Sequence, residues 1–320
     1  MVRQLATLLV GIALGSSLGL QGETRTARLP GRMPDLSISP ILPSVQEDSK
    51  LQSLQTEAQR AELARDVSAM KQAFVKIVSH CNGKASALYR LRLMQARLGL
   101  AVLHLQEGNA AAALTFLGEG LKEYAGDPAA ELKVLALQCY WIQSTLLFDG
   151  RSWDLCLASL DSMIGLAKTA ETSASRQALA AGLLLRISAF AERKDPRRLD
   201  QECRTIATEY TASEDPFILG AVCTALFNRG IALVQLNRLR EALKQFEQMQ
   251  ERTEGVEDLG LKRIAAWSRF YQASALDMLR RKKEAKAKYA EIIQAHSGSE
   301  DPILKNICAQ AQYYSNSYTK

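Results

Sequence analysis

The chain has 320 residues, of which 47% are hydrophobic and 23% are charged, and its formal net charge is +6. Apart from a run near the N-terminus, no apolar stretch approaches the length of a transmembrane helix, which excludes a protein with several membrane spans. The moderate positive charge favours contact with acidic surfaces without requiring an acidic partner.

The first 22 residues are predicted to be a signal peptide or a membrane anchor. Arg3 precedes an apolar run over residues 5–20, which is how a secretory signal with a short basic region is arranged. Export is our preferred interpretation. Residues 18–20 lack the spacing of two small residues around a third that a cleavage site requires, although residues 15–17 come closer. An uncleaved anchor is the alternative, because the run is only slightly shorter than the ~17 to 25 residues that span a bilayer.

Residues 23–49 are predicted to be a flexible linker, because they lack the apolar periodicity of a packed element. Four prolines interrupt this segment: Pro30, Pro34, Pro40 and Pro43. Its arginines also permit a different interpretation of the N-terminus, an organelle transit peptide. These arginines are Arg25, Arg28 and Arg32.

Residues 50–320 contain a sequence repeat with a period of 43 residues. One set of recurring positions is Ala113, Cys156, Leu199, Ala242 and Ala285, and a second set is Leu117, Leu160, Cys203, Phe246 and Tyr289. Gly230 precedes Ala242 by the same number of residues as Ala273 precedes Ala285. An earlier helix therefore keeps the same period, and each repeat is predicted to be a hairpin of two helices. A period of this length is typical of solenoids, in which stacked hairpins share a core that one hairpin cannot form alone.

Residues 225–246 resemble a tetratricopeptide repeat. Gly230, Leu233, Ala242 and Phe246 take the family's small, aliphatic or aromatic, small and aromatic positions. The next repeat keeps this pattern with Ala273, Leu276, Ala285 and Tyr289, whereas the earlier repeats are degenerate and are identified by the period. The family's usual repeat has about 34 residues, so the longer period predicts helices longer by roughly two turns.

The resemblance implies an all-α fold, a right-handed α-solenoid of about five two-helix repeats of 43 residues with N- and C-terminal capping helices. The N-terminal cap is predicted as a half-repeat over about residues 50–80, and the C-terminal cap as a helix over residues 303–318. Acidic residues before Pro216 and Pro302 mark helix starts, because proline is favourable at the first helical position. The resemblance also implies a scaffold with an extended concave surface that holds another chain.

Six cysteines in an exported protein would ordinarily suggest disulfides. Cys156 and Cys203 occupy core positions of the repeat, and Cys139 and Cys223 lie in apolar helical stretches, so we interpret them as small buried apolar residues. Cys203 with Cys223 is the best candidate pair if a disulfide forms, since a second helix packs on the first helix of the next repeat.

Sequence signatures of catalysis are absent: the chain has no phosphate-binding GxxxxGK[ST], dinucleotide-binding GxGxxG or HExxH motif. Residues 15–19 match the string GxSxG, but they fall within the N-terminal apolar run and do not form a nucleophile elbow. His80, His104 and His296 differ in repeat phase, which gives a zinc site little support. Acidic residues gather at hairpin boundaries, where they act as helix caps. We therefore predict no catalytic, cofactor-binding or metal-binding residues and no enzymatic activity.

A partner-binding groove is predicted on the first helices of the repeats, because the family's concave-face positions carry aromatic residues here. The predicted groove residues are Trp141, Phe227, Ile231, Trp267, Phe270 and Tyr271. Such a surface suits an amphipathic helix or an extended apolar segment. The alternative is that longer helices rotate these residues into the core or against the N-terminal linker.

A basic patch is predicted at Arg280, Arg281, Lys282 and Lys283, in a turn and the start of a helix. A solvated convex face is the simplest interpretation. Anionic lipid or an acidic partner is the functional one. Nucleic acid is not expected, because the patch lacks interleaved aromatic residues apart from Tyr289, which belongs to the core.

These patterns favour an exported, periplasmic or inner-membrane-tethered scaffold that binds another protein or a peptide segment and helps to assemble or stabilise a bacterial envelope complex. Membrane association would then occur through the N-terminus. The alternative is a cytoplasmic or organellar adaptor or regulatory protein with an uncleaved anchor or a transit peptide. An enzyme or a nucleic-acid-binding protein is the third and least favoured class.

Overall fold

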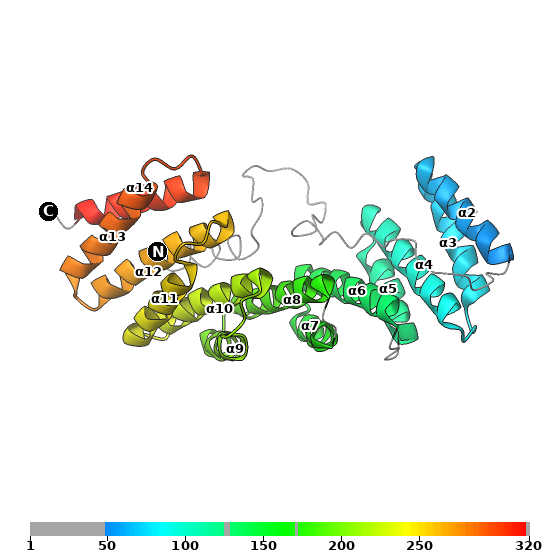
Figure 1. Cartoon of the computed structure of the whole chain (residues 1–320), viewed down its shortest axis with the longest axis horizontal. Coiled ribbons are helices and arrows are strands. Elements are labelled where there is room, and N and C mark those ends of the chain that lie inside the picture. The colour runs from blue at the N-terminus through cyan, green and yellow to red at the C-terminus, as the bar shows by residue number, and fades with distance from the viewer. Residues whose placement is uncertain (1–48, 125–128, 170–171, 318–320) are drawn as a thin grey trace. The chain divides into compact units, whose positions relative to one another are not determined.

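In a computed structural model, the described residues are 49–124, 129–169 and 172–317 (Figure 1). These residues form thirteen α-helices and contain no β-strand. The predicted signal segment, residues 1–22, and all but the last residue of the predicted linker, residues 23–49, lie outside the described residues, so both assignments stay predictions. The helices are α2 (Ser49–Leu63), α3 (Val67–Cys81), α4 (Ala87–Gln106), α5 (Ala110–Tyr124), α6 (Ala130–Asp149), α7 (Trp153–Lys168), α8 (Ser173–Glu192), α9 (Pro196–Glu209), α10 (Pro216–Gln235), α11 (Leu239–Thr253), α12 (Leu259–Met278), α13 (Lys282–His296) and α14 (Pro302–Ser317).

The helix boundaries follow the 43-residue period of the sequence. The first helices of the hairpins, α4, α6, α8, α10 and α12, each have 20 residues and start 43 residues apart. The second helices, α5, α7, α9, α11 and α13, have 14 to 16 residues and also start 43 residues apart. The predicted all-α architecture of five tetratricopeptide-like hairpins is therefore confirmed, and α14 follows in phase as the predicted C-terminal capping helix.

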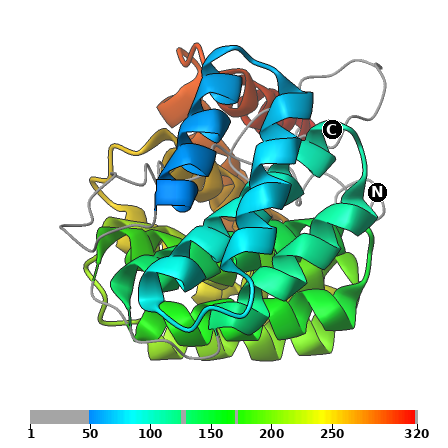
Figure 2. The same ribbon diagram turned by 90° about the vertical axis from the view of Figure 1, so that its right-hand side faces the viewer.

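The N-terminal cap covers the predicted residues but differs from the prediction in its structure. In place of a half-repeat, α2 and α3 form a further helical hairpin and pack side by side (Figures 1 and 2). The chain reverses at Arg65, where φ is 55°, and Asp66 then accepts a hydrogen bond from the backbone N–H of Ala69 at 2.9 Å. This aspartate caps α3 and satisfies one of its free N–H groups, which divides the segment into two helices.

The described residues divide into two compact units, an N-terminal unit of residues 49–182 and a C-terminal unit of residues 183–317. In the N-terminal unit, α3 packs on α4 and α5 packs on α6. In the C-terminal unit, α9 packs on α10, α11 on α12 and α13 on α14. Each of these second helices contacts the first helix of the next hairpin or, for α13, the capping helix α14, so consecutive hairpins share one apolar core within a unit.

Every turn between the two helices of a hairpin contains one residue in the left-handed conformation at the same repeat position. These residues are Arg65 (φ 55°), Gly108 (76°), Arg151 (55°), Lys194 (55°), Asn237 (58°) and Arg280 (64°). In one turn, Asn237 donates its N–H to the carbonyl of Val234 at 3.0 Å and Arg238 donates to Leu233 at 2.8 Å. This pair of bonds is the Schellman motif, which satisfies the free carbonyl groups at a helix end.

The family-like positions lie where the two helices of a hairpin cross. A Cβ atom placed on Gly230 would lie 2.3 Å from Cε1 of Phe246, so only glycine permits this close approach. Ala242 and Phe246 are both fully buried, as are their counterparts Ala113 and Leu117 in α5. The core positions predicted from the period are therefore confirmed in both strong and degenerate repeats.

By length and composition α10 could cross a membrane, but 72% of its apolar stretch is buried inside the protein. Its composition is explained by its place in the core, since α10 packs against α9, α11 and α12.

Cys139, Cys156, Cys203 and Cys223 are buried as small apolar residues, as predicted, and all six cysteines are free thiols. Cys203 and Cys223 do not form the disulfide that the sequence allowed. Burial raises the pKa of the Cys139 thiol to about 12 and that of the Cys223 thiol to about 11, and it raises the pKa of Cys203 well above its usual value. Thiols held in the protonated state by burial are poor nucleophiles and poor metal ligands.

Candidate interaction surfaces

The aromatic residues of α10 and α12 pack on one another. The ring centroid of Phe227 lies 6.3 Å from that of Phe246 and 5.8 Å from that of Tyr271. Trp267 lies 5.6 Å from Phe270, and Phe270 lies 5.4 Å from Tyr289 on α13. These edge-to-face and tilted contacts link the first and second helices of two consecutive hairpins.

Five of the six predicted groove residues are buried. Phe227, Ile231, Trp267, Phe270 and Tyr271 are between 1% and 7% exposed. The structure therefore does not have an open aromatic groove on α10 and α12, and the alternative of rotation into the core fits these positions. The physical reason is that Phe227 and Tyr271 both pack against Phe246, which itself fills the space that Gly230 leaves.

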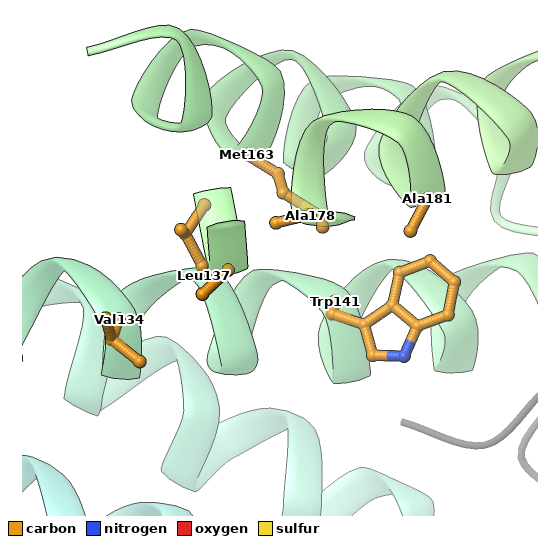
Figure 3. A pocket seen from close by; sticks show the side chains of 7 residues that line it. Val134, Leu137, Trp141, Met163, Ala178 and Ala181 are labelled. Carbon is orange, nitrogen blue, oxygen red and sulfur yellow. The ribbon is translucent and has the colours of Figure 1, made fainter. Parts of the chain in front are cut away.

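Trp141 on α6 is the exception, because its side chain is only partly buried. Its indole ring borders a small apolar notch between α6 and α8, which Met163 of α7 also lines (Figure 3). The notch has a volume of about 10 Å³, about the space of one water-sized group. The residues that line it are Val134, Leu137, Trp141, Met163, Ala174, Ala178 and Ala181.

The notch exists because α8 presents small side chains to Trp141. Ala178 and Ala181 lie one turn apart on the face of α8 that borders the notch (Figure 3). Two repeats later, the corresponding positions of α12 carry Ile264 and Trp267, which are both buried. The same architecture thus has a filled position in the C-terminal unit and an accessible apolar space in the N-terminal unit. The sequence signal for the notch was this change of side-chain size at one repeat position, which motif matching does not detect.

The basic patch lies in the turn between α12 and α13 and in the first turn of α13. Arg280 is the left-handed turn residue, with φ of 64°. Arg281 donates two hydrogen bonds to Glu284, at 2.7 and 2.6 Å, and these bonds raise the pKa of its guanidinium. Lys282 and Lys283 are exposed. Arg280, Lys282 and Lys283 therefore present their positive charges to solvent, whereas the charge of Arg281 is neutralised by Glu284.

A polar network that the sequence did not predict surrounds Asp200 on α9. The carboxylate accepts hydrogen bonds from Arg229 at 2.9 Å, from Arg238 at 3.0 Å and from Arg204 at 3.1 Å, and only 6% of the Asp200 side chain is exposed. Three guanidinium groups compensate for the burial of this charge. The signal in the sequence was a carboxylate at a repeat position that is otherwise apolar in α5, α7 and α11, but its partners come from separate helices.

The three histidines have separate environments. His104 stacks on Phe116 with ring centroids 5.5 Å apart, and His80 lies 2.9 Å from the ammonium of Lys84. Burial, and secondarily Arg269, lowers the pKa of His296. Within residues 49–124, 129–169 and 172–317, no group of three or more His, Cys, Asp or Glu side chains is placed to hold a metal ion.

No protein-family model and no curated protein matches the chain. Similar solved structures include the apo form of RapI, with a TM-score of 0.46, 11% identity and coverage of 82% of this chain and 98% of RapI. NprR in complex with its cognate peptide NprX has a TM-score of 0.41, 14% identity and coverage of 86% of this chain and 74% of NprR. Acl4 (residues 1–338), the assembly chaperone of RpL4, has a TM-score of 0.46, 16% identity and coverage of 84% and 98%. These similarities are distant, and we infer the function from the chain's own surfaces.

Proposed function

We propose that this chain is a non-enzymatic scaffold that binds another protein or a peptide segment. The observation that carries this proposal is the apolar notch at Trp141, where an aromatic ring and the small side chains of α8 leave space for an apolar group of a partner. Tryptophan residues in pockets are typical energetic centres of protein interfaces. Because the lining is almost entirely apolar, the group that it fits is an aliphatic or methyl-bearing side chain.

The repeated hairpins support this proposal, since stacked repeats expose successive first helices along an extended surface. An amphipathic helix or an extended apolar segment would place one side chain in the notch and contact neighbouring helices with the next. Affinity would then come from a central anchor at Trp141 and from weaker contacts around it.

We further propose that the partner belongs to a bacterial envelope complex, which the scaffold helps to assemble or stabilise. This proposal rests on the apolar run at residues 5–20, which favours export to the periplasm or tethering to the inner membrane. The second candidate is a cytoplasmic or organellar adaptor, which is favoured by the atypical cleavage region and by Arg25, Arg28 and Arg32.

The binding proposal is tested by purifying the tagged full chain from its native cells and identifying the proteins that accompany it. Trp141→Ala removes the aromatic wall, and Ala181→Leu fills the notch. Each should lower recovery of the partner by at least about tenfold, since truncating a hot spot typically costs ~2 kcal/mol or more. Leu155→Ala, which removes an exposed leucine from α7, is the matched control and should retain the partner. Equal recovery with all four proteins would refute the notch as the binding site.

The location is tested separately by fractionation and by mass spectrometry of the native protein. Cleavage after about residue 22 in a periplasmic fraction is the expected result. An intact Met1 in a cytoplasmic fraction would favour the adaptor, and it would leave the binding experiment unaffected.

A further inference from the structure

The turns inside the hairpins of the C-terminal unit lie along one edge of that unit. Arg238, in the turn between α10 and α11, reaches Asp200 near the start of α9 at 3.0 Å, so these two turns are neighbours. At the other edge, the end of α11 meets the end of α9, where Arg252 donates to the carbonyl of Thr211 at 2.7 Å. Consecutive hairpins are therefore stacked in the same sense, and equivalent repeat positions form rows.

One of these rows is basic. The second residue of each second helix in the C-terminal unit is Arg197 in α9, Arg240 in α11 and Lys283 in α13. These three side chains, which we call the basic row, are spaced by one repeat. In the N-terminal unit the same position carries Ser68, Ala111 and Asp154. The positive charge is thus a property of the C-terminal unit and not of the repeat.

Further cations flank the basic row on the same edge: Lys194, Arg280, Lys282 and Lys286. All seven side chains are exposed, and none has a hydrogen-bond or ion-pair partner among the described residues. The carboxylates of Asp200, Glu241 and Glu284 are already bonded to arginines. Only Glu192 and Asp277, within these turns, are carboxylates without such a partner in the described part of the chain. The edge therefore presents uncompensated positive charge to solvent.

We propose that the basic row and its flanking cations bind the anionic headgroup surface of a lipid bilayer. Tips of turns that lie along one edge can approach a planar surface together, and the basic row lacks the interleaved aromatic side chains on which the bases of a single strand stack. Met278, at the end of α12, is 51% exposed beside Arg280 and offers an apolar group to the headgroup region. Basic side chains near an anionic membrane surface add their attractions, and the attraction falls off within a Debye length.

This inference goes beyond the proposed function, because it concerns a different surface in a different unit. Loss of bilayer binding would leave the Trp141 notch intact, and loss of the notch would leave the basic row intact. The apolar N-terminal run could also bring the chain to a membrane, but it would do so without regard to lipid charge.

The test uses the purified full chain and two kinds of vesicle, pure phosphatidylcholine and equal parts of phosphatidylcholine and phosphatidylglycerol. We expect tighter binding to the anionic vesicles, with the difference disappearing as salt is raised. The variant Arg197→Glu/Arg240→Glu/Lys283→Glu should lose at least about tenfold of the binding to anionic vesicles and none of the binding to neutral ones. Acidic residues are favourable in the first turn of a helix, as Asp154 already is in α7, so this variant should fold.

The matched control, Lys50→Glu/Lys122→Glu/Lys305→Glu, makes the same change in net charge at exposed lysines elsewhere. It should bind anionic vesicles nearly as the unmodified chain does. Equal losses in both variants, or equal binding of the unmodified chain to both kinds of vesicle, would overturn the proposal. So would binding of a single-stranded oligonucleotide that depends on the basic row while anionic vesicles bind no better than neutral ones.

Discussion

The two units share one repeat period but differ in how the first helices α4 and α6 of one unit and α10 and α12 of the other begin. In the C-terminal unit, Asp215 caps α10 and Asp258 caps α12, with the carboxylate accepting hydrogen bonds from backbone N–H groups. In the N-terminal unit, Ser86 and Ala129 stand before α4 and α6 and make no side-chain cap. In both units, the turn within each hairpin has a residue in the left-handed conformation at the same repeat position. The period is therefore maintained by turn geometry, whereas the caps vary.

The units also differ in what fills the space between hairpins. The C-terminal unit uses large aromatic rings, with Phe227, Phe246 and Tyr271 in mutual contact. The core of the N-terminal unit around α4 to α6 is built mainly from leucine and alanine, and Trp141 lies at its surface beside the notch. Aromatic rings fill the space between hairpins in the C-terminal unit, whereas smaller side chains leave the apolar notch open in the N-terminal unit.

Trp267→Ala tests this comparison with the largest expected effect, because it gives α12 the residue that α8 has at Ala181. Trp267 is 1% exposed, and truncation of a buried tryptophan costs ~3–5 kcal/mol. Its indole Nε1 has no hydrogen-bond partner in the described part of the chain, which places the cost toward the lower end of that range. Urea denaturation measures the loss. Trp267→Phe is the control and should cost much less stability, since it keeps an aromatic ring at this position. An equally small loss for the alanine variant would mean that position 267 is not in the core.

Two glycines of α10 should change the stability of the protein in opposite directions when each is replaced by alanine. Gly230→Ala forces a Cβ into the ring of Phe246 and should destabilise the protein by ~1–3 kcal/mol. Gly220→Ala meets open space and should stabilise it by ~0.5–1 kcal/mol, since alanine is the better helix former. Thermal melts of both variants compare the two effects. Stabilisation by both substitutions would show that α10 and α11 do not cross as closely as described.

The sequence predicted the hairpins because the repeat period constrains position even where the residues have changed. Cys156 and Leu160 depart from the family's pattern, yet both are fully buried at the predicted crossing. Helix starts at Pro216 and Pro302 were also predicted, since aspartate before proline is a local signal.

Side-chain orientation was harder to predict than the hairpins. Phe227 was assigned to a concave surface by analogy with shorter repeats, but its burial depends on Phe246 and Tyr271, which come from other helices. The Trp141 notch likewise depends on another helix, because it exists only where α8 carries Ala178 and Ala181 in place of larger side chains. A single sequence contains no direct signal for a contact between residues that lie a full repeat apart.

A pair of reciprocal cap substitutions tests the difference in capping between the units. Ala129→Asp should give α6 the cap that it lacks and stabilise the protein by ~0.5–2 kcal/mol, and Asp215→Ala should cost a similar amount by removing two hydrogen bonds from the start of α10. Hydrogen exchange can assign each effect to its own unit. Ala130→Asp, one residue inside the helix, controls for the added negative charge near the helix dipole. Equal stabilisation by Ala130→Asp and Ala129→Asp would mean that charge alone, and not a cap, is responsible.

The left-handed turn residues give the smallest expected effect and test what the two units have in common. Gly108 occupies this position without strain, whereas Arg151, at the next turn of the same unit, adopts φ of 55° with a side chain attached. The left-handed conformation costs a residue with a side chain ~1–2 kcal/mol, and glycine avoids this cost. Glycine is in turn disfavoured by ~0.5–1 kcal/mol, because it has more conformational entropy to lose when the chain folds. Arg151→Gly should therefore raise stability by about 0.5 kcal/mol, whereas Arg151→Val should lower it, because a β-branched side chain is strained at positive φ. If valine and glycine had the same effect on the midpoint of thermal unfolding, the turn would not be held in the left-handed conformation, and the recurrent turn could not be what maintains the period across both units.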